Sequence, residues 1–408
     1  MTLTEIKGGV CAAKGFRAAG MHCGIRKNTS KKDIALIVAD KPCAAAGVYT
    51  QNKVFAAPVG VTKAHLANGY AQAVICNSGN ANTCNSDGYD KAEATCNALA
   101  KELGISADDV IVASTGVIGV PLPLDPILGA IRPLIHSLWN DEEAGDAAAT
   151  AIMTTDTKKK EFSYSFELAG KTVNLGGICK GSGMIEPNMA TMLGFITTDV
   201  AITPELLHKA LKYAISDTFN MVSVDRDTST NDMVTVLASG CAENPLIDTA
   251  GDDYETFKSA LYRLCRSMAM AIAADGEGAT KLLECTVSGA ASHDDAKVLA
   301  KSVIRSSLVK AAMFGADANW GRILCALGYA GVDMDPDKVD VSFRSCEGSI
   351  PVCVNGRGIP FDEDIAKKIL TQKTIYIDVD MKSGAEYATA WGCDLTYEYV
   401  KINGDYRS

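Results

Sequence analysis

The stretch Lys180–Phe195 reads KGSGMIEPNMATMLGF and joins a glycine-rich loop to an apolar run that predicts a buried strand. Glycines permit backbone angles that other residues avoid, and the proline in this loop stiffens the approach to Ala190 and Thr191. A hydroxyl residue at the head of a buried strand fits a nucleophile that self-cleavage exposes at a new N-terminus. On residue types alone, an ordinary junction between a loop and a strand is the commoner arrangement, so both interpretations stay open.

Self-cleavage at this point would follow a defined chemistry. The Thr191 Oγ atom would attack the Ala190 carbonyl carbon to form an ester, and water would then release a chain that begins at Thr191. The new α-amine has an ordinary pKa of ~7.7–8.0, against ~10.4 for lysine, so it can act as a base near neutral pH. It sits on the same residue as the hydroxyl that it must activate, which fixes the two groups together.

An N-terminal nucleophile needs hydrogen-bond donors for the oxyanion, and Thr115–Gly116 is the candidate pair. These residues follow the strand-like run VIVAS and supply one hydroxyl and an accessible backbone N–H. Losing one such donor typically raises the barrier by ~2.7–4 kcal/mol. A simple glycine turn after a strand explains the same residues equally well.

Short β-type runs alternate with amphipathic helices along most of the chain, which predicts an α/β (α+β) protein of layered sheets and helices. The expected strands are 34–39, 72–76, 109–114, 193–199, 233–239, 281–288, 338–343, 374–380 and 394–402, with a hairpin at 161–178. Apolar periodicity predicts helices over 88–103 and 253–274, and Thr203 followed by Pro204 predicts the start of a helix over 203–215. The segments interpreted as site-bearing loops are NSGNAN (77–82), STGVIG (114–119), DRDTSTND (225–232), DGEGATK (275–281) and GADANWGR (315–322).

The composition of the 408 residues excludes several classes of protein. Hydrophobic residues make up 47% and charged residues 22%, as in a globular protein. A net charge of −10 argues against a nucleic-acid partner, and the tightest basic run, Lys158–Lys160, is interpreted as a solvated turn. No stretch reaches the ~20 apolar residues of a membrane helix, and the N-terminus lacks an apolar signal core. A cytoplasmic protein without a membrane partner is therefore expected.

Three other kinds of site fit the sequence poorly. Gly170–Thr172 lacks the earlier glycine of a phosphate loop, because Ser165 stands there, and is interpreted as part of a hairpin turn. Ser182 does not fit a hydrolase nucleophile elbow, because G-x-S-x-G would need glycine at positions 180 and 184. The 14 cysteines have no C-x-x-C spacing and the five histidines are isolated, so no metal site is expected. Most cysteines, such as Cys76 and Cys325, are interpreted as small core residues.

Taken in order, these segments resemble the ornithine acetyltransferase family of arginine biosynthesis, also called bifunctional glutamate N-acetyltransferase/amino-acid acetyltransferase. The resemblance is carried by NSGNAN, STGVIG, MTTDT, KGSGMIEPNMATML, DTSTND, DGEGATK, NWGR and the C-terminal KINGDYRS. These segments span nearly the whole chain, and their shared order makes the resemblance specific. Arg226 stands in place of a family glycine and Ala318 in place of a common proline; neither is a catalytic position.

The resemblance implies cleavage between Ala190 and Thr191, which gives an α chain of 1–190 and a β chain of 191–408, assembled as a heterotetramer of two copies each. It implies an αββα sandwich similar to that of N-terminal-nucleophile hydrolases. By their places in the family motifs, Thr191 matches the nucleophile, and Thr115 and Gly116 match its oxyanion hole. The positions that match substrate-binding residues are Thr154, Lys180, Thr191, Glu277, Asn403 and Ser408.

The implied reaction is a two-step acetyl transfer from N2-acetylornithine to glutamate through an acetyl-Thr191 ester, with no metal and no bound cofactor. Lys180 fits a substrate carboxylate, while Glu277 fits either an ornithine ammonium or the Thr191 amine. An exposed lysine and a helix-terminal glutamate are the plain structural alternatives. Use of acetyl-CoA as a further donor stays open. So do two other functions, a self-processed aminopeptidase or amidohydrolase and an amino-acid sensor that never cleaves itself.

Overall fold

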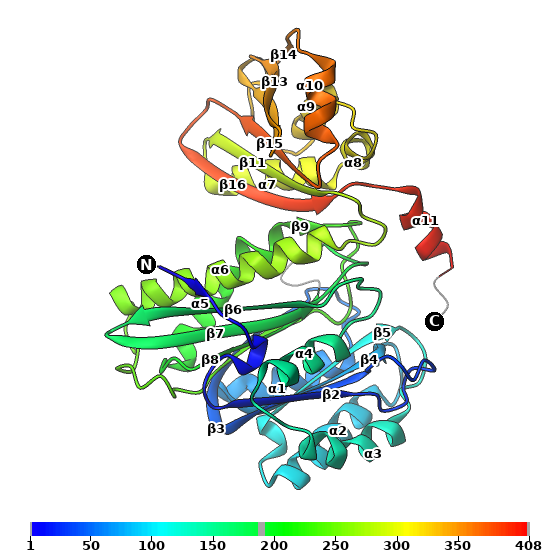
Figure 1. Ribbon diagram of the computed structural model, residues 1–408, viewed down its shortest axis with the longest axis vertical. Coiled ribbons are helices and arrows are strands. Elements are labelled where there is room, and N and C mark those ends of the chain that lie inside the picture. Colours follow the sequence, from blue (N-terminus) through cyan, green and yellow to red (C-terminus); the bar gives the residue numbers. More distant parts are fainter. Residues whose placement is uncertain (1, 187–191, 406–408) are drawn as a thin grey trace.

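The computed structural model describes residues 2–186 and 192–405, and Figure 1 shows the course of the chain. In chain order, its first strands and helices are β1 (Thr4–Glu5), β2 (Phe16–Met21), β3 (Ile34–Tyr49), α1 (Ala57–His65), β4 (Tyr70–Asn80), α2 (Gly88–Leu103), β5 (Val110–Val117), α3 (Leu124–His136), α4 (Glu142–Ala151), β6 (Lys160–Leu168) and β7 (Lys171–Lys180). Next come β8 (Leu193–Thr198), α5 (Pro204–Ser216), β9 (Val222–Ser223), β10 (Met233–Ala238), α6 (Asp252–Ala274), β11 (Leu282–Ala290), α7 (His293–Arg305), α8 (Ser307–Phe314) and α9 (Trp320–Gly328). The last are β12 (Asp340–Ser345), β13 (Gly348–Val354), β14 (Arg357–Gly358), α10 (Glu363–Leu370), β15 (Thr374–Asp380), β16 (Glu386–Cys393) and α11 (Tyr397–Gly404).

The long strand β3 organises the larger sheet, because its two halves have different neighbours. The first half pairs antiparallel with β2 and β4, and residues from Ala44 onward pair antiparallel with β10. The register shifts between Val38 and Cys43, where the strand changes partners. The resulting strand order is β1-β6-β7-β8-β10-β3-β4-β5, with β2 paired to β3.

Side chains from the two halves of this sheet meet in one buried core. It joins Ile178 and Phe195, from β7 and β8, to Ile37 and Val74, from β3 and β4. The opposite face of the β6–β10 half packs against α5 and α6, and the opposite face of the β3–β5 half packs against α2 and α3. Figure 1 shows these helix pairs on the two outer sides of the strands. The predicted layered α/β fold, an αββα sandwich, is confirmed.

A second sheet lies beyond α6, in the upper part of Figure 1. Its strand order is β14-β13-β12-β15-β11-β16-β9. Helix α6 contacts β6 and β7 of the first sheet as well as β11 and β16 of the second, so it separates the two. The apolar side of the second sheet, with Phe343 and Ile377, shares a core with Leu299 of α7 and Ile369 of α10. The loop after α6 reaches the first sheet, where Asp275 forms an ion pair with Lys160 of β6.

Most of the predicted elements are present. The helices predicted over 88–103, 203–215 and 253–274 are α2, α5 and α6. The hairpin at 161–178 is formed by β6 and β7, and its turn places Ala169 and Gly170 at φ values of 50° and 74°. Gly170–Thr172 is therefore turn and strand, as the sequence predicted.

The prediction of a strand over 394–402 is wrong, because this segment contains helix α11. The β16 ladder ends at Cys393, and the carboxylate of Asp394 accepts backbone hydrogen bonds from the loop after α6, which closes the strand. The apolar alternation that suggested a strand has no core to face, since Tyr397 is 83% exposed and Val400 is 70% exposed.

The cysteine interpretation is right for Cys76, which is buried, and wrong for Cys325, which is exposed. Cys325 lies on α9 between the buried residues Ile323 and Leu327, on the side of the helix that faces away from the core. An apolar sequence environment therefore did not identify the exposed face of this helix.

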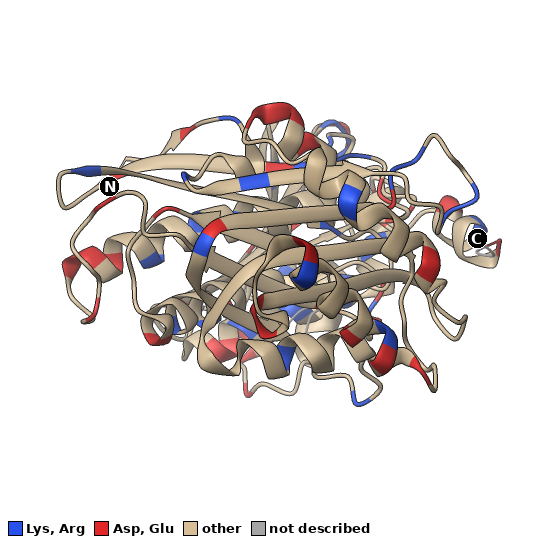
Figure 2. Ribbon diagram, turned by 90° about the horizontal axis from the view of Figure 1, so that it is seen from below, with Lys and Arg blue, Asp and Glu red and all other residues tan. Residues whose placement is uncertain are grey.

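Figure 2 shows that positions of both charge signs are scattered over the ribbon, while most of the length of the strands in this view carries neither. Within the described ranges, no helix is long and apolar enough to cross a membrane.

Candidate active site

Two parallel strands, β4 and β5, end side by side at one edge of the sandwich. Pairing continues to Gly79 and Gly116, so much of NSGNAN and STGVIG forms strand ends and not the loops that were expected. Gly116 has a φ of 130°, and a Cβ atom there would lie 2.6 Å from the backbone nitrogen of Asn80. Only glycine fits this close approach of two backbones. The glycine of the predicted oxyanion pair is therefore required by the fold itself.

Asn231, from the DRDTSTND segment, fastens these strand ends. Its side-chain amide donates to the carbonyl oxygens of Ala81 (2.6 Å) and Ser114 (2.8 Å). The side-chain oxygen of Asn231, Oδ1, accepts a hydrogen bond from the hydroxyl of Thr83 at 2.8 Å. Ser114, the residue before Thr115, is thus hydrogen-bonded to the DRDTSTND segment. The sequence had marked the segment but not the part that this asparagine plays.

Lys180 is the last residue of β7 and is only 9% exposed. Its ammonium group donates to the Thr115 hydroxyl oxygen at 3.3 Å. Its charge also acts on the buried carboxyl groups of Asp156 and Asp232. The plain alternative, an exposed lysine, is wrong. A cation this deeply placed favours an anionic group in the adjoining cavity.

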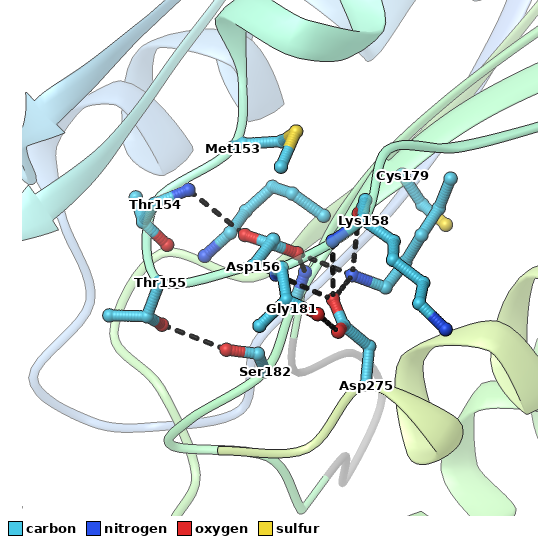
Figure 3. Close-up of polar contacts among 12 residues, drawn as sticks. Met153, Thr154, Thr155, Asp156, Lys158, Cys179, Gly181, Ser182 and Asp275 are labelled. Carbon is cyan, nitrogen blue, oxygen red and sulfur yellow. Dashed lines mark hydrogen bonds and ion pairs between the residues drawn. The ribbon is translucent and has the colours of Figure 1, made fainter. Parts of the chain in front are cut away.

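The buried carboxylate of Asp156 joins two parts of the predicted site, as Figure 3 shows. Its oxygens accept from the backbone N–H groups of Thr154 (2.9 Å) and Gly181 (2.8 Å). Lys160 donates both to Asp156 (2.7 Å) and to Asp275 (2.5 Å). Lys160 therefore connects three loops through these two carboxylates. They are the loop with Thr154, the loop after β7 and the loop after α6.

The charges of this network determine its protonation. Burial opposes ionisation of Asp156, but the cations Lys180 and Lys160 outweigh it and lower the pKa of the carboxyl to about 2. Burial likewise opposes the charge of Lys160, and the carboxylates of Asp156 and Asp275 outweigh it, so the pKa of this lysine is raised. The interpretation of Lys158–Lys160 as a solvated turn is wrong at its last residue, which is 2% exposed.

Glu277 enters the site from the loop after α6 and is 8% exposed. Its backbone N–H donates to the carbonyl oxygen of Ser182 (3.0 Å), and its carboxylate accepts from the side-chain amide of Asn403 (2.8 Å). A Cβ atom at Gly183 would overlap the Glu277 carboxylate, so glycine at this position makes room for it. The predicted residues Glu277 and Asn403 thus contact each other.

One cavity of about 330 Å³ collects every predicted site residue that the structure describes. The predicted residues that line it are Thr115, Gly116, Thr154, Lys180, Glu277 and Asn403. Thr155, Thr230 and Asn231 add further polar groups to its wall. A pocket of this size with few charged groups suits a small polar molecule.

The remaining predicted residues, Ala190, Thr191 and Ser408, lie outside the described residues. Met192, to which Thr191 is bonded, lines a second cavity of about 20 Å³. That cavity shares Thr115 and Lys180 with the larger one. The chain therefore re-enters the described part of the structure beside the predicted oxyanion pair.

Arg226, which replaces a family glycine, has a φ of 72°. This is the left-handed region that glycine favours. Arg226 therefore adopts the backbone conformation that a glycine at this position would favour.

Replacing Lys160 by methionine is expected to reduce the free energy of unfolding by about 3–5 kcal/mol, because it leaves two buried carboxylates without their cation. Lys159→Met is the matched control, since Lys159 is 44% exposed and its ion pairs contribute about 0–1 kcal/mol. Urea denaturation at pH 7 measures both. Equal urea midpoints for the two variants would contradict the assigned role of Lys160.

The same experiment has a defined pH dependence. The folded-state pKa of Asp156, about 2, is below the ordinary value of about 3.9, so ionised Asp156 stabilises the fold above that ordinary value. The stabilisation is lost as the pH falls toward 2. The difference between wild type and Lys160→Met is therefore expected to be smaller near pH 2 than at pH 7.

The described residues supply a candidate oxyanion site and two charged groups that an acyl transfer could use. Thr115 offers a hydroxyl and Gly116 a backbone at the cavity wall, where an oxyanion can be stabilised. Lys180 adds a buried cation, and Glu277 adds a carboxylate across the same cavity. Among the described residues, no group of three or more His, Cys, Asp and Glu side chains is placed to hold a metal ion.

Comparison with known proteins places this site in context. Residues 17–408 match the model of the ArgJ family. The chain is 52% identical over 394 residues to "Arginine biosynthesis bifunctional protein ArgJ 1" of Clostridium acetobutylicum, covering 96% of each chain. It is 50% identical over 405 residues to the ArgJ protein of Symbiobacterium thermophilum, covering 99% of each. A crystal structure of ArgJ from Bacillus halodurans is 44% identical, with a TM-score of 0.51, over 53% of this chain and 100% of that chain.

Proposed function

The chain belongs to the ArgJ family, and from this premise we propose that it cuts itself between Ala190 and Thr191 and transfers an acetyl group from N2-acetylornithine to glutamate in arginine biosynthesis. The observation that carries the proposal is the single cavity, which gathers the hydroxyl, the glycine backbone, the cation and the carboxylate of the predicted site. Met192, the residue bonded to the proposed nucleophile, lines the smaller cavity that shares Thr115 and Lys180 with this one.

The first half of the reaction acetylates the enzyme. The α-amine of Thr191 takes the proton of its own hydroxyl while Oγ attacks the acetyl carbonyl carbon. Thr115 and Gly116 stabilise the oxyanion that develops on the carbonyl oxygen. The C–N bond of acetylornithine then breaks, the leaving amine takes the proton from the Thr191 ammonium, and ornithine departs. Acetyl-Thr191 remains as an ester.

The second half returns the enzyme to its starting state. The amine of glutamate attacks the ester carbonyl carbon, the Thr191 Oγ atom leaves with a proton, and N-acetylglutamate is released. Both amino-acid substrates carry an α-carboxylate, which is the anionic group that the buried ammonium of Lys180 favours. Glu277, which lines the same cavity, supplies a negative charge for an ammonium group. Thr154 and Asn403 line the remainder, and Ser408 completes the set of proposed substrate contacts.

The proposal includes an assembly of two α chains (1–190) and two β chains (191–408), a cytoplasmic location, and no metal or resident cofactor. Acetyl-CoA is proposed as a further acetyl donor. The groups that accept acetylornithine supply the same oxyanion stabilisation to a thioester.

Transfer of a labelled acetyl group tests the reaction. With acetylornithine that carries 13C at both acetyl carbons as donor and glutamate as acceptor, we expect labelled N-acetylglutamate, and a β chain that is about 44 mass units heavier when glutamate is omitted, because a labelled acetyl group replaces a hydrogen. Mass spectrometry detects both products. Free acetate formed at the same rate with and without glutamate would indicate a hydrolase. Reversible ligand binding to an uncut chain would indicate a sensor.

A further inference from the structure

Asp232 is a buried carboxyl group that the predicted site did not include. It directly precedes β10 and is 2% exposed. Although burial outweighs their effect, the Ser229 side chain and the Met192 backbone lie close enough to its carboxyl group to lower its pKa. Its Oδ2 atom has no hydrogen-bond partner within residues 2–186 and 192–405. Buried carboxyl oxygens without a partner are uncommon, because burial removes the water that would otherwise solvate them.

The position of Asp232 relative to the proposed cleavage site is set by strand pairing. β8 and β10 run parallel, and the Met233 N–H donates to the Met192 carbonyl oxygen at 2.9 Å. Asp232 and Met192 therefore lie directly beside each other. Met192 is bonded to Thr191, so Asp232 lies beside the residue that immediately follows the proposed nucleophile in the chain.

The surroundings of Asp232 limit what can pair with its free oxygen. Asp232 lines the cavity of about 20 Å³ together with Lys180, Thr115 and Met192. Lys180 is a cation facing this space, yet its ammonium donates to Thr115. Burial, which is the largest influence, raises the pKa of the Asp232 carboxyl well above its usual range. A second positive group next to Oδ2 would reverse this and stabilise the carboxylate.

Self-cleavage creates such a group. Breaking the bond between Ala190 and Thr191 converts an amide nitrogen into an α-amine, whose protonated form carries three N–H donors. We infer that Asp232 is a positioning residue that binds the new α-amine of Thr191 through Oδ2 and orients it toward its own hydroxyl. The inference rests on the proposed function, because it requires the cut at Ala190.

A variant pair tests the inference. Asp232→Asn is compared with Asp199→Asn, since Asp199 is also fully buried, accepts backbone N–H groups from Asn174 (2.7 Å) and Lys14 (3.2 Å), and follows the far end of β8. In cleaved Asp232→Asn we expect kcat to fall by about 10–100-fold, with a change in the KM for acetylornithine of less than about threefold, because orientation of the base is lost.

The pH profile separates this role from a structural one. The Asp232 carboxylate favours the charged form of the amine, so removing it lowers the pKa of the amine. The acidic limb of the kcat/KM profile is expected to move about one pH unit lower in Asp232→Asn and to stay in place in Asp199→Asn. If the two variants have the same kcat and the same acidic limb of the kcat/KM profile, the inference is overturned.

A crystal structure of the mature wild-type enzyme provides a test that does not depend on the variants. The expected distance from the Thr191 nitrogen to Asp232 Oδ2 is about 2.7–3.2 Å. An ordered water on Oδ2, with the amine more than about 4 Å away, would overturn the inference even if Asp232→Asn fails to fold. Intact mass of the wild type distinguishes this failure from a failure of the proposed function, because only the latter leaves the chain uncut.

Discussion

Thr191→Ala is expected to yield one uncut chain and to abolish acetyl transfer. The alanine side chain has no hydroxyl to attack the Ala190 carbonyl carbon, so neither the ester nor the new α-amine forms. The variant loses both the nucleophile and the base, which act as one catalytic unit. Removing such a unit typically lowers kcat by about 10⁴-fold or more. Denaturing intact-mass analysis measures the cut, and the labelled acetyl assay measures the transfer.

Thr191→Ser provides the control for this experiment. Serine keeps the hydroxyl and the amine and lacks only the methyl group, so we expect cleavage and partial activity. A Thr191→Ala protein that is cut at the same bond would show that another group cleaves the chain. A wild type that stays whole would contradict the nucleophile assignment and favour the sensor.

The sequence predicted the elements whose side chains follow a regular period. IALIVA in β3 and the apolar face of α6 have local patterns that only a strand and a helix can bury. It failed at α11, where Leu395, Tyr397 and Tyr399 alternate with polar residues like those of a strand, although Tyr397 is exposed and packs on no core. Whether an apolar residue is buried there depends on where β16 ends, which is a property of the whole sheet.

The site was predictable to the extent that its residues lie in recognisable segments. Thr115, Lys180 and Glu277 come from three segments that the sequence had marked, and they line one cavity. Lys160 was missed, because its partner Asp275 lies 115 residues further along the chain and the neighbouring lysines are exposed. Asp232 lies inside a segment that the sequence had marked, but its free oxygen is visible only once β8 and β10 are paired.

Gly116→Ala is expected to reduce acetyl transfer by about 10²–10³-fold. An added Cβ would lie 2.6 Å from the Asn80 nitrogen and 2.7 Å from the Gly79 Cα, so β4 and β5 must separate at the predicted oxyanion site. The φ of 130° is also unfavourable for alanine. The free energy of unfolding is expected to fall by about 2–5 kcal/mol from overpacking and backbone strain together. Steady-state kinetics and urea denaturation measure the two effects.

Gly119→Ala separates backbone strain from the loss of the oxyanion donor. Gly119 follows β5 and has a φ of 75°, but a Cβ there meets nothing within 4 Å. Alanine at this position should cost about 1–2 kcal/mol in stability through its left-handed backbone, with activity nearly unchanged. If Gly119→Ala loses as much activity as Gly116→Ala, the effect at 116 comes from general weakening of the β5 end. If only Gly116→Ala loses transfer, and the labelled acetyl group no longer accumulates on its β chain, the backbone at Gly116 stabilises the oxyanion of the acetylation step.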